Sequence, residues 1–268
     1  MALKLNIRNG EIHFQGKDAE NLLLMDADIF KVKKMRQSGY KRVYALLCEP
    51  TWIHGKQLKK FLIKYNRYFD KIFTFDKDLL KLDPKKFTFI HPLVPKFVHD
   101  YGIHEKTKNL SMVISHKRGT FEYELRHQIG AEFKDLIDCL KPGDKRVQWL
   151  DDYFKDVRYA IVVENTKMDN YFTEKVTECF YTGTVPIYRG CPNIGKFFNT
   201  DGIITFDTIE DLRAILSTLS EEDYLSRMDA IRENFELVKN HPTVCLGDEG
   251  HNSEFYAKIL DEIPKDND

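Results

Sequence analysis

Short apolar runs alternate with longer segments of helical period along most of this sequence. The runs "YKRVYALLCEP", "YAIVVEN" and "TVPIYRG" are almost continuously apolar, which is typical of strands buried on both faces of a parallel sheet. Between such runs, "GKQLKKFLIKYNRYF", "FTEKVTECFYTG" and "TIEDLRAILSTLS" repeat apolar residues three and four positions apart, which predicts helices. A further helix is predicted over "TFEYELRHQIGAEF", with Tyr123, His127 and Ala131 on one face and Leu125 beside them.

A polar stretch, "DYGIHEKTK", interrupts this rhythm and has no apolar period, so we interpret it as a linker. Alternating strands and helices on both sides of it predict two α/β domains with parallel sheets. We place an N-terminal domain at residues 1–104 and a C-terminal domain at residues 105–268. One long helix is expected over "SEEDYLSRMDAIRENFELVKNH", and the last helix is expected to pack back on the N-terminal domain. Two Rossmann-like domains facing a cleft would suit a reaction between two substrates.

The composition narrows the class of protein. The chain has 268 residues and is 42% hydrophobic, which is ample for two packed cores. No apolar run reaches the roughly 18 residues of a membrane span, and "MALKLNIRNGEIHF" alternates like a strand instead of resembling a signal peptide. The five cysteines are scattered, which argues against a zinc site or a disulfide framework. We therefore expect a cytoplasmic protein.

The charge is unevenly distributed. Residues 1–100 hold 20 Lys and Arg against 11 Asp and Glu, whereas the remainder holds 21 against 31. Solvated helix faces would explain this. Alternatively, the basic first half attracts a peripheral membrane surface or an anionic acceptor. No motif of the usual nucleic-acid-binding folds is present, so no specific nucleic-acid partner is expected.

Polar side chains gather in "VVENTKMDNYFTEK", where an apolar run ends and a helix begins. Glu164 and Asn165 stand at the carboxyl end of the predicted strand, and Thr173 is a plausible N-cap for the helix. Each residue alone would fit ordinary capping or a surface ion pair. Together, a helix N-terminus with Lys175 beside it forms an anion site, and Glu174 lies at the positive end of the helix dipole. A sugar-linked diphosphate fits this combination, because Glu and Asn orient sugar hydroxyls.

A family resemblance rests on this block. Glu164-Asn165, Tyr171-Phe172-Thr173-Glu174-Lys175, Val185-Pro186-Ile187-Tyr188 and Gly190-Cys191-Pro192 together resemble the donor-binding block of the α1,3-fucosyltransferases. The resemblance implies an inverting glycosyltransferase of the GT-B type. Its C-terminal domain would bind a nucleotide sugar, normally GDP-fucose, and its N-terminal domain would hold a glycan acceptor. No cofactor and no metal ion would be required, and the Asp-x-Asp triplet at Asp26–Asp28 lies far from the donor block.

Without a metal ion, protein cations must neutralise the leaving diphosphate. Lys175 is the first candidate. The family also has an Arg before the first helix of the donor domain, and Arg118, with Lys117 adjacent, stands at that place. Arg126 is the alternative if the alignment shifts. The resemblance further implies that Tyr171 contacts the nucleotide and that Tyr188 packs beneath the site.

An inverting transfer also needs a general base from the other domain. Glu49 follows the strand "YALLC", as a Glu does in the family, although the family's flanking Gly and Asn are Cys48 and Pro50 here. Glu49 and Glu174 are thus the predicted catalytic residues. Asp76 and His91 are reserve candidates on the acceptor side.

Three alternatives remain open. The donor could be another nucleotide sugar such as UDP-xylose or UDP-galactose, because a diphosphate motif does not fix the base or the sugar. The chain could be a non-catalytic module that binds glycan or nucleic acid through its basic half. It could also be an inactive transferase, given the altered context of Glu49.

Overall fold

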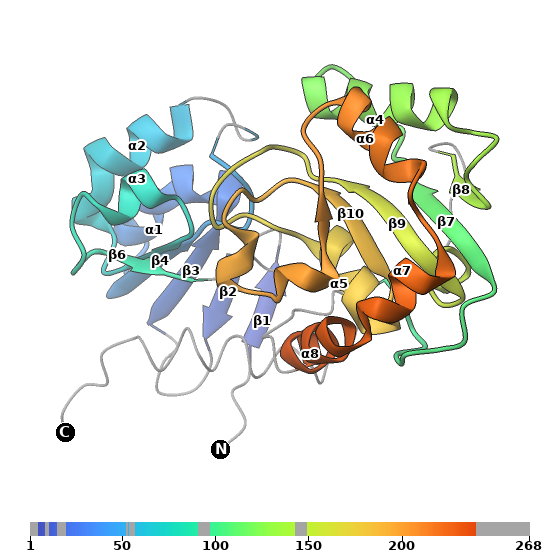
Figure 1. Cartoon of the computed structure of the whole chain (residues 1–268). Helices are drawn as coiled ribbons and strands as arrows, with labels where there is room; N and C mark the ends of the chain where they lie inside the picture. The colour runs from blue at the N-terminus through green and yellow to red at the C-terminus, as the bar shows by residue number, and fades with distance from the viewer. Residues whose placement is uncertain are drawn as a thin grey trace. The chain divides into compact units, whose positions relative to one another are not determined.

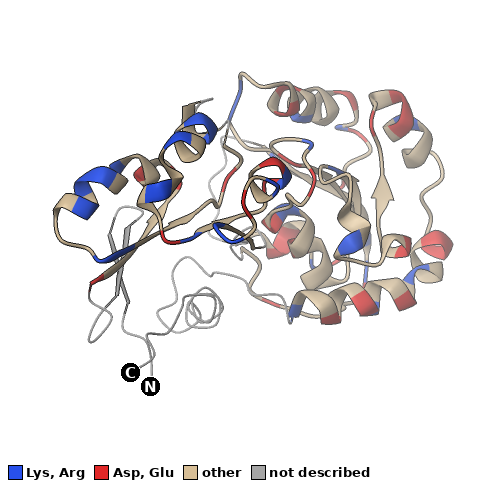
Figure 2. Cartoon of the chain, turned by 90° about the vertical axis from the view of Figure 1, so that its left-hand side faces the viewer, with Lys and Arg blue, Asp and Glu red and all other residues tan. Residues whose placement is uncertain are grey.

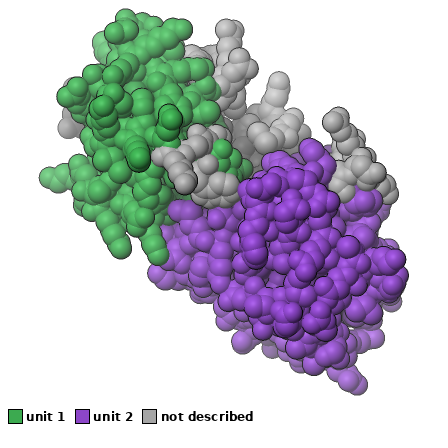
Figure 3. Space-filling view, turned by 90° about the horizontal axis from the view of Figure 1, so that it is seen from above, with its two compact units in different colours: residues 1–93, 247–268 green, residues 94–246 purple. Residues whose placement is uncertain are grey.

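The computed structural model describes residues 5–8, 11–14, 20–51, 53, 57–90, 97–142 and 149–239 of the chain (Figure 1). These residues divide into two compact units (Figure 3): those up to residue 90 belong to the first unit and those from residue 97 to the second. Each unit has its own sheet and its own helices.

The first unit is built on a six-stranded sheet of order β1-β2-β3-β4-β5-β6. Strands β3 to β6 pair in parallel, whereas β1, β2 and β3 pair antiparallel at one edge. Sequence analysis predicted the parallel part but not the separate strand β2, although the Asn-Gly pair between β1 and β2 is a hairpin signal. The strands are β1 Leu5–Arg8, β2 Glu11–Phe14, β3 Asn21–Met25, β4 Arg42–Leu46, β5 Ile72–Thr74 and β6 Phe87–Phe89.

The helices of the first unit lie on one face of its sheet. Strands β3 to β6 follow chain order across the sheet, so right-handed crossovers bring every connecting helix to the same side. Leu58 and Leu62, one turn apart, are fully buried in a core shared with Val43. The segment after β3 is helical. The helices are η2 Asp26–Lys31, α1 Val32–Gln37, α2 Gln57–Tyr65, η3 Asn66–Tyr68 and α3 Lys77–Leu80.

The second unit has a fully parallel five-stranded sheet of order β11-β10-β9-β7-β8. From β7 the chain first adds β8 on one side and then crosses to the other side for β9. The carboxyl ends of β7 and β9 therefore form the topological switch point, where α/β sheets bind ligands. The strands are β7 Lys108–Val113, β8 Cys139–Lys141, β9 Val157–Val163, β10 Val185–Arg189 and β11 Ile204–Thr205.

Helices cover both faces of the second sheet (Figure 1). Along β9, Ile161 and Val163 face a core shared with α4 and α6, whereas Ala160 and Val162 face a core shared with α5. Helix α8 packs on α5, where the Tyr181 hydroxyl donates to the Val238 carbonyl at 2.9 Å. The helices are α4 Phe121–Glu132, η4 Asp151–Tyr153, α5 Glu174–Thr182, η5 Ile194–Lys196, η6 Thr200–Gly202, α6 Ile209–Leu216, α7 Glu221–Ser226 and α8 Met228–Lys239.

Two features near the ends of the second unit differ from the expectations. The single long helix is two helices, α7 and α8, separated at Arg227. Residues 97–104, placed in the first domain by sequence, contact the second unit: the N–H groups of His99 and Asp100 donate to Asp151, and that of Gly102 donates to the Tyr181 carbonyl. The packing of the last helix against the N-terminal domain stays a prediction.

Candidate functional site

A cavity of about 340 Å³ lies within the second unit at the switch point between β7 and β9. Three charged side chains of α5, one of α4 and one of β8 reach its wall, together with the ends of β7 and β9. The rest of the wall is largely apolar. The lining residues are Phe97, Val113, Ile114, Ser115, Arg126, Lys141, Leu150, Phe154, Ile161, Val162, Val163, Glu174, Lys175 and Glu178.

Glu164 fixes the point at which α5 begins. Its buried carboxylate accepts the Thr173 N–H at 2.8 Å and the Thr173 hydroxyl at 2.7 Å. Thr173 is the N-cap residue, with extended backbone, and its hydroxyl oxygen accepts the Lys175 N–H at the helix start. The predicted capping is therefore present, and the positive end of α5 is held at the cavity wall.

Lys175 lies among carboxylates at this helix start. Its Nζ is 2.9 Å from Glu174 Oε1 and 3.5 Å from Glu164 Oε2, and it donates to the Thr173 hydroxyl at 2.8 Å. Burial lowers the pKa of Lys175, but Glu174 and Glu164 outweigh burial and raise the pKa above its ordinary value. Burial likewise raises the pKa of Glu174, yet Lys175 lowers it overall. The cavity wall therefore carries an ammonium group and an ionised carboxylate.

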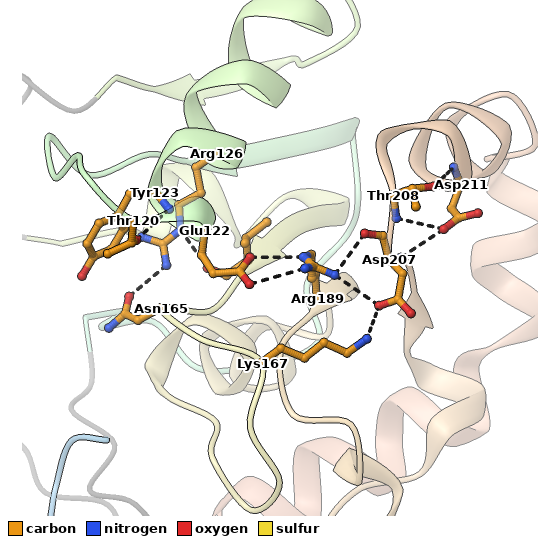
Figure 4. Close-up of polar contacts among 11 residues, drawn as sticks. Thr120, Glu122, Tyr123, Arg126, Asn165, Lys167, Arg189, Asp207, Thr208 and Asp211 are labelled. Atoms are coloured by element: carbon orange, nitrogen blue, oxygen red, sulfur yellow. Dashed lines mark hydrogen bonds and ion pairs between the residues drawn. The ribbon is translucent and has the colours of Figure 1, made fainter. Parts of the chain in front are cut away.

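Arg126 supplies a second cation from α4 (Figure 4). The side chain is almost fully buried, and Nε donates to the Val163 carbonyl while Nη2 donates to Asn165 Oδ1, both at 2.9 Å. Burial lowers the pKa of Arg126, an effect that Glu164 opposes. These two hydrogen bonds hold the guanidinium at the carboxyl end of β9, and they leave Nη1 without a partner among the described residues.

The predicted helix α4 is present. It buries Leu125, Arg126 and Ile129, whereas Ala131 is exposed. Arg126, the alternative arginine, therefore lies at the cavity.

The structure does not bring Arg118 or Lys117 to the cavity. The Arg118 side chain is 59% exposed and pairs with Glu124 at 2.7 Å. Glu124 also accepts the Gly119 N–H, so the turn before α4 is held by contacts outside the cavity. Lys117 is exposed.

The two tyrosines of the predicted site are fully buried. Tyr171 lies in the segment that leads into α5, and the Tyr188 hydroxyl oxygen accepts the Cys191 N–H at 3.0 Å. Gly190 packs directly against this layer: a Cβ there would stand 2.4 Å from Tyr188 Oη and 2.5 Å from Glu164 Cγ. Only glycine fits at this position without displacing the carboxylate that positions α5.

Arg189 connects the loops at the same edge of the sheet (Figure 4). From the end of β10 it pairs with Glu122 in the first turn of α4, at 3.1 Å. Its Nη1 also donates to the carbonyl and the carboxylate of Asp207, at 3.0 and 3.2 Å. Lys167, in the loop between β9 and α5, pairs with the same Asp207. Ion pairs thus connect the start of α4, the end of β10 and the loops that follow β9 and β11.

Three further polar residues of the cavity wall, Ser115, Lys141 and Glu178, were not predicted from the sequence. Ser115 Oγ and Glu178 Oε2 are buried and have no hydrogen-bond partner among the described residues. Glu178 Oε1 accepts the Phe97 N–H at 2.6 Å, and burial, opposed by the N–H groups of Phe97 and Val98, raises the pKa of Glu178 to about 8. The only signal in the sequence was an acidic residue within the apolar run "VTECFY".

In the first unit, Glu49 lies in the loop after β4 and is half-buried. Asp26 holds this loop, because its Oδ1 accepts the N–H groups of Cys48 and Glu49 at 2.9 and 3.2 Å. The first Asp of the Asp-x-Asp triplet therefore positions a backbone turn, and Asp28 pairs with Lys31. The carboxyl ends of two adjacent parallel strands meet at Glu49.

Asp76 is buried and caps α3. Its carboxylate accepts the N–H groups of Asp78 and Leu79 and pairs with Lys59 at 3.1 Å. This arrangement gives Asp76 a local structural role. His91, the other acceptor-side candidate, lies outside the described residues.

In the described part of the chain, no cluster of three or more His, Cys, Asp or Glu side chains could hold a metal ion. No described helix combines the length and the apolar character needed to cross a bilayer.

Sequence comparison finds fucosyltransferases among the similar proteins. An α-(1,3)-fucosyltransferase of Helicobacter pylori is 30% identical over 118 residues, which are 37% of this chain and 25% of that protein. An α-(1,4)-fucosyltransferase of Arabidopsis thaliana is 25% identical over 91 residues, which are 32% of this chain and 23% of that protein. The predicted resemblance to the fucosyltransferases is confirmed. The matched part spans only about a quarter of each relative's length, and no family model matches the chain.

Solved structures show the fold. An α1,3-fucosyltransferase with GDP aligns at a TM-score of 0.52 and 15% identity, covering 84% of this chain and 74% of that one. The same kind of enzyme with GDP-fucose gives 0.51 and 14%, covering 85% and 76%. TarM gives 0.57 and 13%, covering 93% and 56%. The predicted α/β fold of the GT-B class is therefore confirmed.

Proposed function

We propose that this chain is an inverting glycosyltransferase that moves a sugar from a nucleotide donor, first of all L-fucose from GDP-fucose, to a hydroxyl group of a glycan. The observation that carries the proposal is the pair of cations, Arg126 and Lys175, on one cavity wall at the switch point. This position, with the N-terminus of α5 alongside, suits a diphosphate.

In the proposed complex the diphosphate lies against Lys175, Arg126 and the positive end of the α5 dipole. Lys175 would exchange part of its contact with Glu174 for a phosphate oxygen. Glu174 and the Asn165 amide would then be free to bind hydroxyl groups of the sugars. The two cations offset the charge that develops on the leaving diphosphate, so the step needs no bound metal ion.

Glu49 is the proposed general base. It takes the proton of the acceptor hydroxyl while that oxygen attacks the anomeric carbon of the donor sugar. The bond between the anomeric carbon and the diphosphate oxygen breaks, and the nucleoside diphosphate leaves with the bonding electrons. Attack from the opposite face inverts the anomeric centre. The hold of Asp26 on the Glu49 loop supports this role, whereas the capping contacts of Asp76 leave it out of the proposal.

Guanine is the proposed donor base because the fucosyltransferases of similar fold were solved with GDP and GDP-fucose. GDP and GDP-fucose were bound by those two proteins. Because the proteins are only 14–15% identical to this chain, the likeness shows the fold alone. UDP-xylose and UDP-galactose remain the alternative donors, and the donor test separates the two bases.

The donor test is a thermal-shift titration with GDP and UDP, each with a chelator and with added magnesium. GDP in chelator is expected to raise the melting temperature, since a ligand that binds only the native state stabilises it. Stabilisation by UDP alone would redirect the proposal to a uridine donor, and no shift with either nucleotide would contradict the donor site.

The base is tested by Glu49→Gln, with Glu20→Gln as a control for an exposed carboxylate of the same unit. Glu49→Gln should keep the GDP-induced shift and lose transfer from GDP-fucose by about 10²–10⁴-fold. Turnover equal to that of Glu20→Gln would remove Glu49 from the mechanism.

A further inference from the structure

One helical layer of the first unit is strongly basic. Helices α1, α2 and η3 together contain seven Lys and Arg and no Asp or Glu. Because these helices lie on the same face of the sheet, their outward side chains share one surface. Figure 2 shows Lys and Arg in blue along the helices of the first unit.

Most of this charge is not neutralised by neighbours. Arg36 pairs with Asp70, and Lys59 pairs with Asp76 and Asp78. The other five cations are exposed and form no ion pair with a described acidic residue. We call these five the basic patch: Lys33, Lys34, Lys60, Lys64 and Arg67.

The basic patch converges on two tyrosines. Lys33 Nζ is 4.0 Å from the ring centroid of Tyr65 and Lys64 Nζ is 5.3 Å from it. Arg67 lies 5.2 Å and Lys33 Nζ 5.7 Å from the ring centroid of Tyr68. Lys64 and Lys33 lower the pKa of the Tyr65 hydroxyl, as a positive local potential requires. Like charges so close together favour binding of an anionic surface.

Exposed apolar side chains lie beside these cations. Phe30 is 38% exposed and stacks edge-on to Phe61 of α2, with ring centroids 4.9 Å apart. Ile63, next to Lys64 on α2, is 45% exposed. A helix that combines basic and apolar side chains in this way is typical of attachment to the interface of a membrane.

We propose that the basic patch, with Phe30 and Ile63, docks the first unit on a bilayer that contains anionic phospholipids. The lysines and the arginine would contact lipid phosphates, while Phe30 and Ile63 would enter the acyl boundary. A nucleic acid fits less well. The rings of Tyr65 and Tyr68 are already covered by cations and are poor platforms for bases, and Ile63 cannot stack. This inference does not depend on the proposed transfer reaction.

The experiment is co-sedimentation of the purified full chain with vesicles of phosphatidylcholine alone or with phosphatidylglycerol added. Binding is expected only with phosphatidylglycerol, and it should weaken as salt is added. Lys60→Gln with Lys64→Gln should weaken binding about 30-fold, or about fivefold for each charge removed. Ile63→Ser should weaken binding at high salt more than at low salt.

The matched control is Lys134→Gln with Lys196→Gln, two exposed lysines of the second unit. This variant loses the same charge and should bind vesicles within twofold of the wild type. Equal binding to both vesicle types, no binding at all, or equal loss in the two double variants would overturn the proposal. So would tight binding of a single-stranded oligonucleotide that the vesicles cannot displace.

Discussion

Glu178 should make the stability of the second unit fall as pH rises, and Glu178→Gln should remove that fall. In the folded protein, burial raises the pKa of the Glu178 carboxyl to about 8. The pKa of an exposed Glu is about 4.3. The native state therefore holds a proton that the unfolded chain releases. The stabilisation is complete below the pKa that Glu178 has in the unfolded chain, and it is lost as the pH rises towards the pKa that Glu178 has in the folded protein.

The magnitude follows from linkage. Between the two pKa values one proton is released on unfolding, so the free energy of unfolding falls by about 1.4 kcal/mol per pH unit. From pH 5 to pH 7 this amounts to about 2–3 kcal/mol. Glutamine keeps a carbonyl oxygen that can accept the Phe97 N–H, and it has no charge to release. Relative to the wild type, Glu178→Gln should therefore gain stability over that interval.

The assay is urea denaturation at several pH values between 5 and 8, followed by Trp149 fluorescence in a Trp52→Phe background so that the second unit is the reporter. Glu222→Gln makes the same chemical change at an exposed position of α7 and should keep the wild-type slope. If Glu178→Gln also kept that slope, Glu178 would be ionised in the folded protein and the reasoning from burial would be refuted.

Two further predictions concern the packing around Glu164 and the cation Arg126 of the cavity wall. Gly190→Ala should lower the free energy of unfolding by about 1–3 kcal/mol, because its Cβ would stand 2.5 Å or less from Tyr188 and Glu164. An unchanged urea midpoint would contradict this, because it would mean that Tyr188 and Glu164 move aside at no cost in stability. Arg126→Lys should weaken GDP binding about tenfold in calorimetry, since lysine cannot keep both the Val163 and Asn165 hydrogen bonds. Arg118→Lys should leave GDP binding unchanged. If Arg118→Lys weakened binding more than Arg126→Lys, Arg118 would belong to the site after all.

The alternation of the second unit could be predicted from sequence because its strands are buried on both faces. Runs such as the one around Ile161 are then continuous and easily recognised. The short strand β8 has no such run and was missed. In the first unit, β2 was missed although the Asn-Gly pair before it was visible, because the two strands were treated as one alternating segment.

The helix start at Thr173 could also be predicted, because capping is a local interaction between residues close in sequence. The choice between Arg118 and Arg126 could not. It depends on which face of α4 is buried, and Arg126 lies on that face. The burial of Arg126 can be recognised only once the structure places its hydrogen-bond partners, the Val163 carbonyl and the Asn165 side chain, beside it.

Glu178 illustrates the same limit. An acidic residue one turn into a helix predicts a solvated position, and nothing nearby in sequence indicates otherwise. Its partner, the Phe97 N–H, is 81 residues away and comes from the segment at the beginning of the second unit. Long-range contacts of this kind decide the electrostatics of the cavity.

The most direct test of the donor site is calorimetry of GDP binding in a chelating buffer, with wild type, Lys175→Ala and Lys117→Ala. The wild type should bind without any divalent ion. Lys175→Ala should bind at least about tenfold more weakly, because it loses a charge-assisted hydrogen bond to phosphate, and Lys117→Ala should match the wild type. Wild-type binding that appears only when magnesium is restored, or undiminished affinity in a folded Lys175→Ala protein, would contradict the account.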